Sequence, residues 1–159
     1  MKTIVSVTTA AAILAGALAG LEAQTKSHVI SAVKDAQWGP APPMLPPGAE
    51  IAVLAGNPMG TSAYTVRLKF PANYAIPAHS HPTDENVTVI SGTFSMGMGD
   101  KLDPAKSKAF PAGSFAVAPA KVNHFAFAKG AAIVEVSAIG PFAMTYVNPA
   151  DDPTKTATK

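Results

Sequence analysis

The chain of 159 residues contains no cysteine. An exported domain of this composition has no disulfide, and any metal site in it has to be built from histidine, carboxylate and weaker ligands. Charged residues make up only 14% of the chain, and Arg67 is the only arginine. The charges form no long run of one sign and sum to +2 at pH 7, which argues against a nucleic-acid partner.

Two common kinds of active site are also missing. No glycine-rich loop of the phosphate-binding type occurs, and no grouping of Ser, His and Asp suggests a hydrolase triad. Long helices are disfavoured, because the 15 prolines and 12 glycines are costly inside them. The length is that of one globular domain, so a single turn-rich domain is expected.

The longest uncharged stretch, residues 3–21, follows a single lysine. A positive start, an apolar middle and small residues near the end are typical of a secretory signal peptide, which we assign to residues 1–23, with cleavage after Ala19 or Ala23. A membrane anchor is the alternative, but the many Ala, Gly, Thr and Ser residues make the stretch only weakly apolar. We therefore expect a secreted or periplasmic protein with no membrane segment after cleavage.

Residues 24–49 are expected to form a short helix and a proline-rich arm. The sequence KSHVISAVKDAQ, residues 26–37, has apolar residues spaced for one helical face. The following WGPAPPMLPPGAE contains five prolines, which favour an extended chain because proline fixes its own φ and biases the preceding residue away from helix. This arm is expected to lie along the domain or on a partner subunit. At the other end, the polar residues 149–159 predict a flexible tail.

Residues 50–148 contain short apolar runs at near-regular spacing, separated by turn-forming residues. Residues 64–70 alternate apolar and polar side chains, which is the period of a half-buried strand. About eight such runs predict an all-β domain, either a sandwich or a barrel. The runs are IAVLAG, SAYTVRLKF, ENVTVIS, GTFSMGMG, GSFAVAP, HFAFAK, AAIVEVSAI and FAMTYVN.

Three of the four histidines are candidates for one site. On a strand His79 and His81 share a face, and Glu85, at an even offset, can rejoin that face after a bend. His124 follows another strand-turn unit, so an antiparallel neighbour can bring it across the same cavity. Three nitrogens and one oxygen suit a divalent transition metal (Fe, Mn, Ni, Co, Cu or Zn) and leave roughly two positions open in six-coordination. We predict a mononuclear metal site at these four residues.

These residues and their spacing resemble the two motifs of the cupin superfamily. The first motif opens with Gly and continues with His-x-His, three residues, Glu, six residues and Gly. The second is Gly, five residues, Pro-x-Gly, two residues, His, three residues and Asn. The matching positions are His79, His81, Glu85 and Gly92 in the first motif and Gly113, Pro119 and His124 in the second. The resemblance covers about residues 50–148 and implies a single cupin-type jelly-roll β-barrel.

The chain departs from these motifs at three positions, none of them a ligand. Asn73 stands where the first motif opens with Gly, a mild change because Asn tolerates the left-handed conformation. Lys121 replaces the second Gly of the second motif, which predicts a different type of turn there. Ala128 replaces the final Asn, so any role of that Asn elsewhere in the family is not expected here.

Other candidate groups are interpreted as structural. Arg67 could pair with a substrate carboxylate, but it shares its strand parity with Thr65 and Lys69, which favours the polar face. Asp84 is interpreted as a turn residue, and Met96 and Met98 as packing residues rather than copper ligands. The remaining candidates, interpreted as structural or solvated, are His28, Tyr64, Tyr74 and Tyr146.

The resemblance implies a metal-dependent function but does not fix which one, since cupins include enzymes, storage proteins and regulators. The first hypothesis is a metal-dependent oxidoreductase of the dioxygenase type that acts on a small organic molecule. An isomerase or a lyase is the less favoured kind of enzyme. The alternative is a non-catalytic exported protein that binds or senses a metal or small ligand. Because cupins commonly pair through their sheets, a homodimer is expected.

Overall fold

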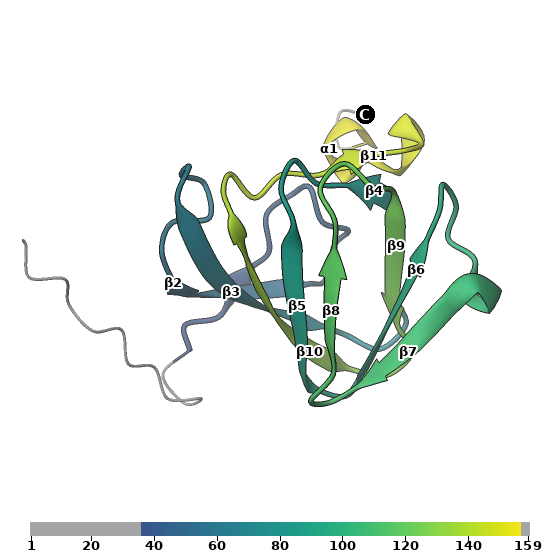
Figure 1. Ribbon diagram of the computed structural model, residues 1–159, viewed down its shortest axis with the longest axis horizontal. Coiled ribbons are helices and arrows are strands. Elements are labelled where there is room, and N and C mark those ends of the chain that lie inside the picture. Colours follow the sequence, from purple (N-terminus) through teal and green to yellow (C-terminus); the bar gives the residue numbers. More distant parts are fainter. Residues whose placement is uncertain (1–35, 157–159) are drawn as a thin grey trace, which may run out of the picture.

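The computed structural model describes residues 36–156, and its regular structure is almost entirely β-strand (Figure 1). One sheet has the strand order β1-β2-β3-β10-β5-β8 and the other β11-β4-β9-β6-β7, with all neighbouring strands antiparallel. The strands are β1 (Gly39–Pro40), β2 (Glu50–Ala55), β3 (Ala63–Phe70), β4 (Tyr74–Ser80), β5 (Glu85–Ser91), β6 (Thr93–Met98), β7 (Ser107–Pro111), β8 (Phe115–Ala118), β9 (His124–Ala128), β10 (Ala132–Ile139) and β11 (Thr145–Tyr146).

The two sheets pack face to face, and side chains from their inner faces form one apolar core (Figure 1). Along β3 every second residue is buried, as the alternation in the sequence predicts. The Phe70 ring stacks on Tyr74 and on Phe94, with centroids 4.9 and 5.3 Å apart. The described chain is thus a β-sandwich of two antiparallel sheets, while closure of its sheets into a barrel stays a prediction.

The outer face of β3 carries the single arginine. Arg67 Nε donates a hydrogen bond to Glu135 Oε2 at 3.0 Å, and the two residues are partners in the β3–β10 register. The guanidinium therefore points away from the interior, as its strand parity predicts.

The predicted helix at residues 26–37 falls almost wholly outside the described residues, as does the predicted signal peptide, so both stay predictions. The described part of the proline-rich region is folded back rather than extended: after β1, the Ala41 amide donates to the Ala49 carbonyl and the Leu45 amide to the Pro42 carbonyl, each at 3.0 Å. We call residues 41–49 the strap. Within residues 36–156 no helix has the length and apolar character needed to cross a bilayer.

Other segments differ from the sequence-based expectation. The two-residue β1, β4 and β7 have no counterpart among the predicted runs, although His79 is expected on a strand: the β4 sequence YAIPAHS contains a proline, and the β7 sequence SKAFP is too short to show an alternation. FAMTYVN forms only the two-residue β11. Short helical turns occur at η2 (Pro104–Lys106), η3 (Pro149–Asp151) and α1 (Pro153–Thr156), the last two within the region expected to be a flexible tail.

Candidate metal centre

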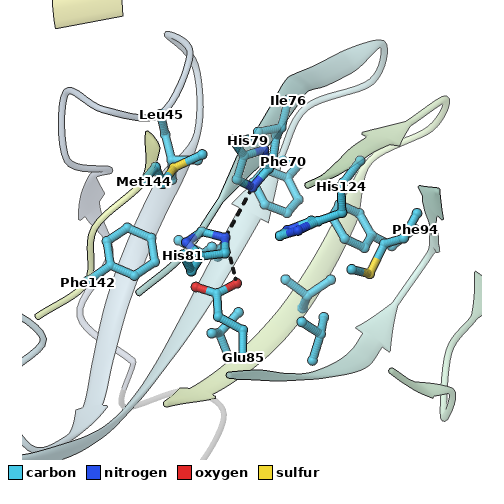
Figure 2. Close-up of a pocket in the computed structure, with 16 residues that line it drawn as sticks. Leu45, Phe70, Ile76, His79, His81, Glu85, Phe94, His124, Phe142 and Met144 are labelled. Carbon is cyan, nitrogen blue, oxygen red and sulfur yellow. Dashed lines mark hydrogen bonds and ion pairs between the residues drawn. The ribbon is translucent and has the colours of Figure 1, made fainter. Parts of the chain in front are cut away.

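The four predicted ligands lie together inside the sandwich. His79 on β4 and His124 on β9 are partners in the β4–β9 register, His81 directly follows β4, and Glu85 opens β5 of the facing sheet. All four are buried, with 2–8% of their surface exposed. Figure 2 shows their side chains pointing into one shared space. The structure therefore brings together every residue that the sequence predicts for the site.

Each imidazole is oriented by a backbone carbonyl. His79 Nδ1 lies 2.7 Å from the Pro77 carbonyl oxygen, His81 Nδ1 lies 2.8 Å from that of Ala143, and His124 Nδ1 lies 3.0 Å from that of Val122. A carbonyl oxygen can only accept, so Nδ1 carries the hydrogen in all three rings. Every Nε2 consequently presents a lone pair, which is the tautomer that binds a metal through Nε2.

These lone pairs face one another at the separations expected of metal ligands. His79 Nε2 and His81 Nε2 are 3.1 Å apart, and Glu85 Oε2 is 3.3 Å from His81 Nε2. The ligand atoms of the three histidines all lie within 4.8 Å of one another. Two nitrogens bound to one ion at about 2.0–2.1 Å are about 3 Å apart when they occupy adjacent positions. The histidine cluster fits a divalent metal ion.

The protonation states support the same conclusion. Burial, together with the neighbouring His124 and His81, lowers the pKa of His79 to about 3. Burial also lowers the pKa of His81 and of His124, so the three rings are neutral at pH 7 and lack the proton that would let one Nε2 donate to another. Burial raises the pKa of Glu85 to about 7, although the neighbouring His124 opposes this effect. A divalent cation would satisfy the facing lone pairs.

The cluster opens onto a small apolar cavity of about 40 Å³. Because one water needs roughly 10–15 Å³ of such space, the cavity has room for about three water-sized groups. Apart from the four predicted ligands, all residues that line it are apolar: Leu45, Leu68, Phe70, Ile76, Val87, Phe94, Met96, Ala126, Val134, Val136, Phe142 and Met144.

Comparison with known proteins agrees with the fold. The family model of the ChrR cupin-like domain matches residues 26–142. The chain belongs to this family of cupins. The resemblance drawn from the two motifs is thereby confirmed.

Solved structures similar to this cupin include those of proteins named for different activities. A candidate acetylacetone dioxygenase from Methylibium petroleiphilum is 20% identical with a TM-score of 0.62, covering 84% of this chain and 89% of that one. The polyketide cyclase RemF from Streptomyces resistomycificus is 15% identical with a TM-score of 0.62, covering 84% and 94%. The DMSP lyase DddQ from Ruegeria pomeroyi is 18% identical with a TM-score of 0.55, covering 70% and 60%. At these identities the similarity shows the fold alone, and no curated protein sequence matches this cupin.

The turns that flank the ligands contain two residues in the left-handed conformation. Lys121 and Asn73 both have φ +62°, a region that glycine occupies more readily; whether the type of turn differs from that of other cupins stays a prediction. The Lys121 amide donates to the His81 carbonyl at 2.8 Å, and this bond holds the turn in place. Gly92 of the first motif has φ +73°, and a Cβ there would collide with the Ala131 carbonyl oxygen, which explains why glycine occupies that position.

Asp84 connects the two motifs of this cupin. Its carboxylate accepts a hydrogen bond from the Ala120 amide at 2.7 Å, so the bend between His81 and Glu85 is tied to the turn that precedes His124. The interpretation of Asp84 as a turn residue agrees with this contact. Together with the bond from Lys121 to His81, it fixes the two halves of the ligand set relative to each other.

Of the remaining candidates, His28 lies outside the described residues, and the Tyr64 ring packs edge-on against Phe142. The hydroxyl of Tyr74 donates to the Pro46 carbonyl and that of Tyr146 to the Met44 carbonyl at 2.7 Å, so both are structural. Met96 lines the cavity, whereas Met98 is half exposed.

Sequence reasoning missed three contributors to the site: Leu45, the carbonyl of Ala143 and the ring of Phe142. A leucine between prolines has no recognisable period, and a carbonyl that orients a histidine has no signature in side-chain identity. No pattern in the chain would have identified them.

Proposed function

We propose that this cupin holds one divalent transition metal through His79, His81, His124 and Glu85, and uses it on a small molecule as an oxidoreductase of the dioxygenase type. The observation that carries the proposal is the set of three carbonyl-oriented imidazoles whose free Nε2 atoms face one another and the Glu85 carboxylate. Such orientation of the outer ring nitrogen is how proteins prepare histidine for metal binding.

The charge of the ligand set favours particular ligands. Three neutral imidazoles and one carboxylate around a divalent ion leave a net charge near +1, which attracts anionic or oxygen-donor molecules to the open positions. A bound redox-active ion supplies Lewis acidity and reactivity toward dioxygen. The protein's part is to fix the four ligands, to exclude bulk water with the apolar lining, and to keep the imidazoles in one tautomer.

The similar structures are compatible with an enzyme and do not select a reaction. A candidate dioxygenase, a cyclase and a lyase share the fold, so the scaffold is compatible with several chemistries. The dioxygenase type comes first because a mixed histidine and carboxylate set with open positions suits redox-active metals.

A non-catalytic exported protein that binds or senses a metal or small ligand is the second candidate. One observation favours it: the cavity lining contains no titratable side chain beyond the four ligands. No separate residue there can act as a general acid or base. Glu85 is the only carboxylate there.

The test uses the protein purified with its native metal. Metal content is measured first, then oxygen uptake with a panel graded by size that runs from small diketones to catechols and flavonols. Retained metal and uptake with a panel member support the enzyme, and tightly held metal with no uptake favours the binding protein. His81→Ala should weaken metal binding by more than about a hundredfold. A His81→Ala protein that still holds one equivalent would contradict the proposed coordination.

A further inference from the structure

We propose that Leu45 is the residue that determines ligand size at the metal centre, limiting the open positions to ligands of two or three heavy atoms. The inference deepens the proposed function and rests on it, because it concerns the same metal. Of the strap residues 41–49, only Leu45 lines the cavity, and its side chain is 4% exposed.

The strap is fixed on both sides of Leu45. Tyr146 donates its hydroxyl hydrogen to the carbonyl of Met44, the residue before Leu45, at 2.7 Å. Tyr74 donates to the carbonyl of Pro46, the residue after it. The Leu45 amide donates to Pro42 at 3.0 Å, and the base of the strap is closed by the bond from Ala41 to Ala49. Four hydrogen bonds therefore hold the isobutyl group in the cavity wall.

Leu45 limits the space without supporting the ligands. Figure 2 shows it beside Met144, on the side of the cavity where His79 and His81 lie. The neighbouring loop is different, because the Ala143 carbonyl orients His81, and changes at Phe142 or Met144 would disturb a ligand. No hydrogen bond to the three histidines comes from the strap, so shortening Leu45 enlarges the cavity and leaves the coordination intact.

The volume sets the size limit. Of the roughly three water-sized groups that fit in about 40 Å³, the ion takes the place of one. Two remain, which matches the roughly two open positions of a six-coordinate ion. Dioxygen or azide fits this space, and a chelating diketonate such as acetylacetonate does not, so an organic substrate of the proposed oxygenase would react from outside this cavity without chelating the metal.

The experiment loads the full-length protein with Co²⁺ and titrates azide and acetylacetonate, following the visible absorption of the cobalt. The wild-type protein should respond to azide and not to acetylacetonate. Leu45→Ala should bind acetylacetonate about tenfold more tightly or better, since single methylene groups already change pocket affinities by about tenfold or more, while its azide affinity and cobalt content stay unchanged. Val89→Ala is the control, because Val89 is a buried core residue that does not line the cavity.

Leu45→Val, which removes a single methylene, provides an intermediate effect if Leu45→Ala folds poorly, as judged from its thermal unfolding. A wild-type protein that binds acetylacetonate as tightly as the variants would overturn the role of Leu45 while leaving the metal centre standing. A wild-type protein that retains no cobalt would contradict the metal centre itself, and the size limit with it.

Discussion

The cavity has two walls that are built differently. One wall consists of strands and carries His79, His124 and Glu85 on β4, β9 and β5. The other consists of irregular segments and carries Leu45 from the strap and Phe142 and Met144 from the loop between β10 and β11. The strand wall holds the metal ligands among apolar side chains, whereas the second wall is wholly apolar and bounds the space beside the ligands.

The difference suggests a division of roles. Ladder hydrogen bonds hold the strand wall in register, so ligand atoms placed there keep the separations that a metal requires. The strap part of the irregular wall depends on a few hydrogen bonds from Tyr74, Tyr146 and the backbone, and its Leu45 side chain can change without moving the ligands. His81 links the two walls, because it directly follows β4 and its Nδ1 donates to the Ala143 carbonyl.

The largest expected effect separates the two walls. His124→Ala removes a ligand from the strand wall and should lower metal affinity by more than about a hundredfold, whereas Leu45→Ala in the irregular wall should leave metal content unchanged. Metal content after dialysis against a chelator measures both. Equal metal loss in the two variants would show that the walls do not divide the roles in this way.

A smaller effect is expected from pH, and it lies on the strand wall alone. Because the pKa of Glu85 is raised to about 7 by burial, a metal that binds below pH 7 has to displace a proton from this carboxyl, and affinity should fall about tenfold per pH unit. Above pH 7 the carboxylate is already ionised, so affinity should be level. Protons compete with the metal for the imidazoles only in more acidic solution, because the pKa values of the three histidines are lowered. Tyr64 stays neutral, because burial and the charge of Glu85 raise its pKa.

Glu85→Gln tests this assignment. The amide cannot ionise, so the variant should bind the metal more weakly at pH 8 and lose the dependence between pH 5 and 7. Competition with a chromophoric chelator, corrected for the chelator's own protonation, gives the affinities. If the same pH dependence persists in Glu85→Gln, the displaced proton comes from another group.

The strand wall could be predicted from the sequence because it obeys simple periods. Strand parity predicted that His79 and His81 share the inner face at β4 and that Arg67 lies on the outer face of β3. The motif spacing predicted that Glu85 and His124 join the same site. The irregular wall could not be predicted in this way. Whether Leu45 enters the cavity depends on two tyrosine hydroxyls far along the chain, and the cavity volume depends on how both sheets pack. Neither property is written in a local pattern.

The turn at Lys121 shows the limit of predicting from residue preference, and it provides the smallest expected effect. Lysine at φ +62° adopts an unfavourable conformation because its amide donates to the His81 carbonyl and the Ala120 amide donates to Asp84.

Lys121→Gly relieves the steric cost, which is about 1–2 kcal/mol for a residue with a Cβ, but it also makes the unfolded chain more flexible. We expect a net stabilisation of about 0.5–1 kcal/mol in chemical denaturation. Asn73→Gly, at the same φ, should stabilise the protein less, because asparagine tolerates this conformation better. Lys101 does not have a positive φ, so Lys101→Gly should destabilise the protein. A loss of stability in Lys121→Gly would mean that its side chain contributes more to the turn than its backbone strain costs.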